Sequence, residues 1–352
     1  MPAPSFIHLR LHSEYSIVDG IVRLEEAVEA AAADGMPALA LTDLANVFGM
    51  VKFYQAAREL GIKPIIGCDV WLENEADRDK PHRLLLLVQS RAGYLTLCTL
   101  LTRAYRSNQY RGRAEIRKRW FAESGTQGLI ALSGAHHGDL GQALVVDNLE
   151  QARRIAGEWR ELFPDRYYIE LQRLGRNATV LGAAAVPVEA YVQRAARLAS
   201  ALKLPVVATH PVQFVKPDDF RAHEARVCIA EGFVLSDRRR PSRFGPEQYF
   251  RTQAEMAAAF RDLPQALANS VEIAKRCNLA LELGKTQLPR FPTPNNVGLD
   301  QFLRESAASG LEKRLGQLFP DDKSRAEHRA RYRERLEFEL KTIVQMGFSG
   351  YS

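Results

Sequence analysis

Short runs of apolar residues alternate with longer stretches of helical spacing over the first 230 residues of the chain. The apolar runs cover residues 6–11, 38–42, 63–68, 83–88, 129–132, 167–171 and 204–209. Helical spacing predicts helices at residues 24–34, 50–60, 91–106, 148–163 and 186–203, and a glycine directly follows each of the first two, as expected at helix C-caps. This alternation predicts an α/β fold built from βα units around a parallel sheet.

The number of runs favours a closed barrel over an open sheet. Seven strands with right-handed crossovers in roughly 230 residues suit a βα barrel, because such barrels average about 250 residues. An open, doubly wound sheet is the alternative. Neither a GxGxxG nor a GxxxxGK[ST] motif occurs, so the sequence predicts no dinucleotide or P-loop site.

The composition of the sequence changes beyond about residue 285. The Pro-rich residues 288–294 predict an extended connector, and residues 324–346 predict a charged helix with Leu336, Leu340 and Ile343 on one face. We therefore expect one domain over residues 1–280 and a second, mainly helical region over residues 281–352. The final residues carry no capping or tail chemistry, so we expect the chain to continue beyond Ser352.

Composition narrows the class of protein. The chain has 352 residues with four widely spaced cysteines, which argues against a disulfide scaffold and against a CxxC zinc or redox site. Its longest aliphatic run, residues 84–88, is far below the roughly 18 residues of a membrane span, and no signal peptide precedes it. We expect a soluble, cytoplasmic protein.

The charge is concentrated in one place. The formal net charge is +6, and residues 103–119, here called the basic segment, hold seven basic residues and one acidic residue, a balance of +6. Tyrosine and tryptophan are interleaved with these charges, as in surfaces that bind nucleic acid by phosphate contacts and base stacking. A solvated helix or loop face is the alternative. The candidate residues for binding nucleic acid or a partner are Arg103, Arg106, Arg111, Arg113, Arg117, Lys118 and Arg119.

Polar residues follow several of the predicted strands. His12 and Asp19 come after the first run, Asp43 after the second, Asp69 after the third and His210 after the seventh. The carboxyl ends of parallel strands meet at one rim, so these groups form a mixed nitrogen and oxygen set suited to Zn²⁺, Mn²⁺ or Fe ions that activate water against a phosphoester. The plainer alternative for Asp43 is a cap on the next helix.

Five segments of the chain carry a resemblance to a known family. They are His8-Leu-Arg-Leu-His-Ser-Glu-Tyr-Ser16, Gly35-Met-Pro-Ala-Leu-Ala-Leu-Thr-Asp43, Gly61-Ile-Lys-Pro-Ile-Ile-Gly67, Val206-Val-Ala-Thr209 and Ala266-Leu-Ala-Asn-Ser-Val-Glu-Ile-Ala-Lys-Arg-Cys277. Together they resemble the N-terminal region of bacterial replicative DNA polymerase III alpha subunits of the proteobacterial type. The resemblance implies a distorted seven-stranded polymerase and histidinol phosphatase (PHP) barrel over residues 1–280, followed by the start of a polymerase palm over residues 281–352.

Members of this family with a working barrel site hold a trinuclear metal cluster, and the resemblance assigns its ligand positions here. Five positions keep a side chain that can coordinate a metal: His12, Asp19, Asp43, Asp69 and His82. Five have lost it: Arg10, Leu44, Ala135, Pro211 and Gln213. We expect a degenerate site in which Arg10 neutralises carboxylates that a metal once held, with Zn²⁺ or Mn²⁺ binding weak or lost. A rearranged single-metal site stays open, because His136, His137 and His210 lie close to lost positions.

The resemblance also implies the function. In the full-length chain it implies template-directed DNA synthesis by a DNA-directed DNA polymerase (a nucleotidyltransferase) that uses Mg²⁺ and a DNA primer-template, with the catalytic aspartates beyond Ser352. It implies that the barrel acts as a scaffold for the proofreading exonuclease subunit and other replicase subunits. The alternative is an active metal-dependent phosphoesterase, a 3′–5′ exonuclease or pyrophosphatase, in the barrel. A free-standing enzyme similar to histidinol phosphatase is opposed by the region after Pro294.

Overall fold

The computed structural model describes residues 4–174, 179–180, 186–237, 239–240, 243–285 and 291–351. The chain forms two compact units, Met1–Ala280 and Leu281–Ser352. The strands of the first unit are β1 (Ala38–Leu41), β2 (Lys63–Leu72), β3 (His82–Val88), β4 (Gln109–Tyr110), β5 (Arg113–Ile116), β6 (Leu129–Leu132), β7 (Tyr167–Gln172), β8 (Thr179–Val180), β9 (Val186–Pro187) and β10 (Val206–Thr209). Its helices are α1 (Leu24–Ala33), α2 (Met50–Glu59), α3 (Arg91–Ser107), α4 (Arg119–Ser124), α5 (Asp139–Val145), α6 (Leu149–Leu162), α7 (Val188–Leu202), α8 (Phe220–Glu231), α9 (Gln253–Ala259) and α10 (Pro264–Arg276).

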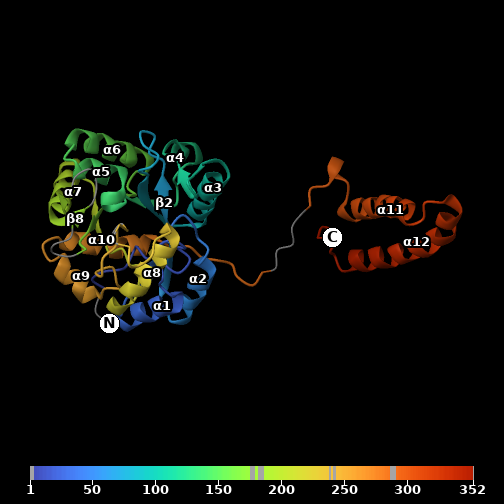
Figure 1. The fold of residues 1–352 in the computed structure, drawn as a ribbon, viewed down its shortest axis with the longest axis horizontal. Helices are drawn as coiled ribbons and strands as arrows, with labels where there is room; N and C mark the ends of the chain where they lie inside the picture. The colour runs from blue at the N-terminus through green and yellow to red at the C-terminus, as the bar shows by residue number, and fades with distance from the viewer. Residues whose placement is uncertain are drawn as a thin grey trace. The chain divides into compact units, whose positions relative to one another are not determined.

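The strands of the first unit close into a ring. The main sheet runs β10-β7-β6-β3-β2, with β1 and the short β5 both paired to β2. Residues 6–12 fill the gap between β1 and the segment after β10: the amide of Ala40 donates to the carbonyl of His8 (3.0 Å), and the amide of His12 donates to the carbonyl of Val212 (3.0 Å). Helices lie around the outside of this ring (Figure 1). The predicted distorted α/β barrel is therefore confirmed.

Two details of the strand prediction were wrong. Residues 6–11 are extended and bonded on both sides, but their pairing is too irregular to form a regular strand. Strand β3 runs antiparallel to both β2 and β6, not parallel. The physical reason is the nine-residue connection from β2 to β3 (residues 73–81), which is too short for a crossover helix and suits a hairpin.

Helix α10 covers the end of the barrel at which the parallel strands begin. Pro264 at its first turn supplies the fixed backbone angle that suits a helix start. Hydrogen bonds then fix the helix and the residues directly after it beneath four different parts of the ring; three of them use a polar side chain and the fourth joins two backbone groups. The contacts are Ile7 N to Ser270 Oγ (3.0 Å), Asn269 Nδ2 to the Val206 carbonyl (2.7 Å), Lys63 Nζ to the Ala274 carbonyl (2.8 Å) and Asn278 N to the Gln89 carbonyl (2.9 Å). The barrel is thus sealed by the last helix of its own unit.

The second unit is a helical hairpin within its described residues. It consists of α11 (Leu299–Leu318) and α12 (Asp322–Gln345), and the Asp321 carboxylate caps α12 by accepting from Ser324 N at 2.8 Å. Glu312 pairs with Arg329 and Arg333 across the two helices. Leu315 and Leu340 are the buried apolar side chains of this hairpin. Of the connector predicted at residues 288–294, residues 288–290 lie outside the described part of the chain.

Among the described residues, none of the helices is long and apolar enough to cross a membrane.

Candidate functional site: a buried network of arginines and carboxylates

The site begins with the alternating sequence at the start of the chain. In an extended segment successive side chains point to opposite faces. Leu9 and Leu11 are fully buried apolar side chains, whereas His8, Arg10 and His12 share the other face and are buried too. Arg10 and His12 contact residues of β2 and β7 across the ring, so this face looks into the barrel.

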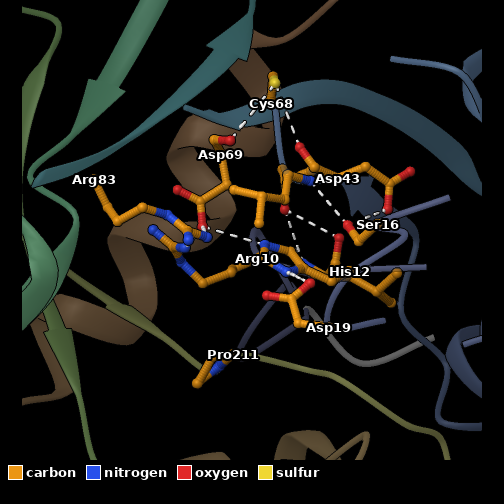
Figure 2. A network of polar contacts seen from close by, with 12 residues as sticks. Arg10, His12, Ser16, Asp19, Asp43, Cys68, Asp69, Arg83 and Pro211 are labelled. Carbon is orange, nitrogen blue, oxygen red and sulfur yellow. Dashed lines mark hydrogen bonds and ion pairs between the residues drawn. The ribbon is translucent and has the colours of Figure 1, made fainter. Parts of the chain in front are cut away.

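Arg10 lies at the centre of the network (Figure 2). Its guanidinium forms two parallel hydrogen bonds to Glu170 of β7, Nε to Oε1 at 2.9 Å and Nη2 to Oε2 at 3.1 Å. Its Nη1 donates to Oδ2 of Asp69 on β2. Burial disfavours the charged guanidinium, but Asp69 and Glu170 more than offset this and raise the pKa of Arg10. Arg10 therefore stays cationic inside the barrel.

Asp69 is shared by three cationic or ionisable groups. Besides Arg10, Nη2 of Arg83 lies 2.5 Å and Nε2 of His12 lies 3.2 Å from its Oδ2. Asp69 is fully buried, which by itself raises the pKa of a carboxyl, yet Arg10 and Arg83 hold its pKa well below the ordinary value. Arg83 also stacks over the Trp71 ring at 4.3 Å. Two guanidiniums thus occupy the surroundings of this carboxylate.

His12 is held between two carboxylates. Its Nδ1 lies 3.0 Å from Oδ1 of Asp19, and its Nε2 faces Asp69 from the other side of the ring. Burial lowers the pKa of this imidazole, but Asp19 and Asp69 outweigh burial and raise the pKa of His12 to about 9. Burial likewise opposes ionisation of Asp19, and His12 reverses this and lowers the pKa of Asp19. We infer a doubly protonated His12 at neutral pH, with both ring nitrogens acting as donors.

Asp43 belongs to a different set of contacts. Its carboxylate accepts hydrogen bonds from Ser13 N (2.7 Å), Ser13 Oγ (2.9 Å) and Ser16 Oγ (2.9 Å). Ser16 Oγ in turn accepts from the amide of Leu44 at 2.8 Å. In Figure 2 Asp43 and Ser16 lie together, apart from Arg10 and Arg83. Asp43 therefore ties the loop after residue 12 to the loop after β1.

His82 lies at the same rim but outside the network. It begins β3 and pairs with Leu72 at the end of β2, because β3 runs antiparallel. Burial lowers the pKa of His82, with smaller effects from Asp139, which raises it, and Lys118, which lowers it further. Of the five positions that keep a ligand side chain, the structure brings His12, Asp19 and Asp69 together and leaves Asp43 and His82 in separate contacts.

Four of the positions without a ligand side chain are also defined. Leu44 is buried and its backbone pairs with that of Asp69 in an isolated bridge, and Ala135 is fully buried. Pro211 offers no side-chain donor or acceptor. The side chain of Gln213 lies beside His12, with its amide nitrogen 3.3 Å from Nδ1, so a neutral amide stands where the family pattern has a histidine.

The neighbouring histidines do not form a replacement ligand set in the described part of the chain. The rings of His136 and His137 lie with centroids 4.0 Å apart and planes tilted by 41°, and burial lowers the pKa of His136 to about 4. His210 is fully buried, and its ring centroid lies 6.2 Å from that of His8. Burial holds the pKa of His210 well below its ordinary value.

These residues do not fit a metal cluster. Among the described residues, no group of three or more His, Cys, Asp or Glu side chains is arranged to hold a metal ion. The reason is visible in the contacts: His12 uses its two ring nitrogens on opposite carboxylates, and Oδ2 of Asp69 is shared by two guanidiniums. Arg10, Arg83 and protonated His12 supply three positive charges to Asp19, Asp69 and Glu170.

The basic segment has partners that its own sequence does not reveal. Five of its seven cations form ion pairs with acids from elsewhere in the first unit or, for Arg113, with Glu115 inside the segment. The pairs are Arg103–Glu123 (2.5 Å), Arg111–Asp79 (2.9 Å), Arg113–Glu115 (3.2 Å), Arg117–Glu73 (2.9 Å) and Lys118–Glu158 (2.7 Å). Arg106 and Arg119 are exposed. Much of the +6 balance is thus neutralised within the fold.

Two central residues were missed in the sequence. Glu170 sits in the predicted strand at residues 167–171, and Arg83 begins the run at residues 83–88. Glu170 is fully buried and accepts from Gln172 Nε2 (3.0 Å) and Thr209 Oγ1 (2.5 Å) as well as from Arg10. A charged residue inside an apolar strand could have indicated a buried ion pair, because charges are rarely buried without a partner.

The chain is similar to several known proteins. Residues 8–174 match the PHP domain family. The chain is 48% identical over 352 residues to the DNA polymerase III subunit alpha of Neisseria meningitidis serogroup A and 46% identical over 348 residues to that of Pseudomonas aeruginosa. These alignments cover 100% and 99% of this chain. Among solved structures, an amidohydrolase from Chromobacterium violaceum is 16% identical with a TM-score of 0.39, over 62% of this chain and 96% of that one.

The chain spans about 30% of the length of the curated relatives that it matches. The resemblance stated from sequence motifs is confirmed: the similarity runs over the whole chain, to the N-terminal region of DNA polymerase III alpha subunits.

Proposed function

We propose that this chain is the N-terminal part of a replicative DNA polymerase III alpha subunit, acting in the cytoplasm, and that its barrel is a scaffold rather than an enzyme. On this proposal the full-length protein is a DNA-directed DNA polymerase that works on a DNA primer-template. The barrel stabilises that subunit and docks the proofreading exonuclease subunit of the replicase, alongside other replicase subunits. Support comes from the 48% identity over all 352 residues to a relative with that name.

One observation carries the choice of scaffold over phosphoesterase. The interior of the barrel mouth is filled by a charge-balanced network in which Arg10 and Arg83 both donate to Asp69. A guanidinium supplies positive charge and directed hydrogen bonds, but it cannot bind and activate a water molecule as a metal ion does. The alternative, a metal-dependent 3′–5′ exonuclease or pyrophosphatase, would need this carboxylate to be released from both arginines.

Metal binding and hydrolysis test this choice directly. We expect purified protein to contain far less than one equivalent of Zn, Mn or Fe by mass spectrometry, and calorimetric titration with Zn²⁺ or Mn²⁺ to show weak binding at most. We expect no nucleotide release from a single-stranded oligonucleotide and no phosphate release from pyrophosphate. Tight stoichiometric binding, with hydrolysis abolished by Asp69→Asn, would instead establish the phosphoesterase.

The helical hairpin is proposed as the start of the polymerase palm. Its described part carries α11 and α12 with few buried apolar residues. On this proposal the aspartates that hold Mg²⁺ for nucleotidyl transfer are supplied by chain beyond Ser352. Purified residues 1–352 should therefore not extend a primer with Mg²⁺ and nucleotides, whereas the full-length subunit should.

For the basic segment we propose a weak contact with DNA through Arg106 and Arg119, the two exposed arginines of the segment that lie outside the ion pairs given above. Charge reversal at Arg111, Arg113 and Arg117 would also break internal ion pairs, so the cleaner variant is Arg106→Glu with Arg119→Glu. We expect this variant to bind a single-stranded oligonucleotide about tenfold more weakly at low salt, with the difference shrinking as salt increases. Arg91→Glu, at the start of α3, is the matched control, and equal affinity of all three proteins would remove the proposal.

A further inference from the structure

Three aromatic side chains lie in or directly after the basic segment, and the fold covers two of them. The ring of Trp120 is buried, and the guanidinium of Arg103 lies 4.2 Å from its centre. The ring of Tyr110 lies beneath the guanidinium of Arg78 at 4.6 Å. The third ring, that of Tyr105 on α3, is 42% exposed. Tyr105 is therefore the aromatic side chain that the basic segment leaves open to a ligand.

Tyr105 is carried by a well-anchored part of helix α3. Leu101 and Ala104, one turn before it and directly before it, are buried. The carbonyl of Tyr105 accepts a hydrogen bond from Nε2 of Gln109 at 2.6 Å, and the amide of Asn108 donates to the carbonyl of Ala104 at 3.0 Å. A tyrosine has two rotatable side-chain bonds, so its ring loses little entropy when a ligand contacts it.

The charges on the same helix are all positive. Helix α3 carries Arg91, Arg103 and Arg106 and no acidic residue. Arg103 is paired with Glu123 of α4 at 2.5 Å. Arg106, directly after Tyr105, is exposed and takes part in none of the ion pairs between described residues. An open aromatic ring and an open guanidinium thus lie next to each other.

The surroundings of α3 keep this positive balance. Residues 73–80 and 91–124, which include the basic segment and the connection from β2 to β3, hold ten basic and six acidic side chains. Lys118 also pairs with Asp139 of α5 and Glu158 of α6, and the excess stays positive when these two acids are included. Helix α2, which packs on β2, adds two basic residues and one acidic residue. A phosphate backbone is the complement that this balance favours.

We propose that Tyr105 stacks on an unpaired base of a DNA strand whose phosphates lie against Arg106 and Arg119, so that this face prefers single-stranded to double-stranded DNA. The inference rests on the DNA contact proposed for the basic segment and names the form of DNA that it takes. An arginine contacts the phosphates of either form. The face of an aromatic ring stacks on a base only where that base is free of its own stack. Tyr105 is thus the side chain that distinguishes the two forms.

The test compares a single-stranded oligonucleotide with a duplex of the same sequence, by fluorescence anisotropy at low salt. We expect the unmodified chain to bind the single strand more tightly. Tyr105→Ser should weaken single-strand binding about fivefold to tenfold and duplex binding by less than about twofold, because only the stacking contact is lost. Tyr105→Phe keeps the ring and should bind both forms like the unmodified chain.

Two further variants separate stacking from apolar contact and from folding. Tyr105→Leu keeps an apolar side chain without a flat ring, and we expect it to lose the preference for the single strand as Tyr105→Ser does. The matched control is Leu95→Ser, since Leu95 is 55% exposed on the same helix. We expect Leu95→Ser to retain the affinities of the unmodified chain for both forms.

The outcomes separate the inference from the proposed DNA contact. Unchanged single-strand affinity in Tyr105→Ser, together with weaker binding by the variant that carries Arg106→Glu and Arg119→Glu, overturns the stacking role and leaves the DNA contact standing. Equal losses for single strand and duplex, or a preference retained in Tyr105→Leu, also overturn the stacking role. Absence of binding to either form by the unmodified chain overturns both proposals.

Discussion

The network around Arg10 and the basic segment contain the same kinds of ion pair in two different surroundings. Arg10 and Asp69 have almost no exposed side-chain surface, whereas Arg111 and Asp79 have 66% and 48% of theirs exposed. A buried charge that loses its partner cannot be rescued by water, but an exposed one can. The few buried charges of the barrel interior should therefore have a large effect on the free energy of unfolding. The exposed charges of the basic segment, although they stand out in the sequence, should have a small one.

The strongest way to break this comparison is Arg10→Met. The substitution leaves Glu170 and part of Asp69 as buried carboxylates without their main cation. We expect a loss of about 3–5 kcal/mol in the free energy of unfolding, the usual effect of removing one partner of a buried pair. Urea denaturation measures it. Arg91→Met on α3 should change the same quantity by less than about 0.5 kcal/mol, and a loss below about 1 kcal/mol for Arg10→Met would contradict the comparison.

The next test is the pH dependence contributed by His12. Its pKa is about 9 in the folded protein against about 6.5 when unfolded. A raised folded pKa means that the stabilisation is fully present below pH 6.5 and is lost as pH rises through 9. The difference corresponds to about 3 kcal/mol. We expect unfolding free energy to fall over this window in the wild type and to fall much less in His12→Gln; parallel curves for the two proteins would argue against a charged His12.

The buried acid within the basic segment should give an intermediate effect. Glu115 is fully buried and accepts from Arg78 Nη2 at 2.8 Å and from Arg113 Nε at 3.2 Å. Glu115→Gln keeps the shape but removes the charge, while both arginines remain partly exposed and can be hydrated. We expect a loss of about 1–2 kcal/mol in urea denaturation. A loss as large as that of Arg10→Met would remove the distinction between the two regions.

The smallest effect is expected at the exposed pair. Arg111→Ala removes the 2.9 Å contact to Asp79, and such pairs contribute about 0–1 kcal/mol because water and salt screen them. We expect a change of less than about 0.5 kcal/mol, which disappears in 1 M NaCl. Thermal unfolding at low and high salt checks this. A large, salt-resistant loss would show that the surface pairs act as a cooperative network.

The fold could be predicted from the sequence because the spacing of apolar residues and the signals at helix ends are local properties of the chain. Helices α1, α2, α3, α6 and α7 lie within two residues of their predicted ends. The direction of β3 was missed although the signal was local as well, since no helical stretch separates residues 68 and 83. The irregular pairing of residues 6–11 could not be predicted, because it depends on partners about 30 positions away on one side and about 200 positions away on the other.

Residues of the site were predicted only where they match a motif of the family or follow the end of a predicted strand. His12, Asp19 and Asp69 were found in this way, and Arg10 was expected to replace a metal. Glu170 and Arg83 were overlooked because both lie within apolar runs, where a charged residue looks like an exposed position. The sequence of the basic segment does not show how much of its charge is paired, because the acids that pair with it, such as Glu73 and Glu158, come from other parts of the chain.

Helix α10 imposes an order of events on a chain that is made from its N-terminus. The hydrogen bond between Ile7 and Ser270 joins residues 263 positions apart. At translation rates of about 5–20 residues per second, Ile7 waits roughly 13 to 53 seconds for its partner. During that time Ile7, Leu9 and Leu11 remain without the barrel that buries them. Residues 7–11 should therefore be bound by nascent-chain chaperones while they wait, and their release should coincide with the emergence of α10 from the ribosome.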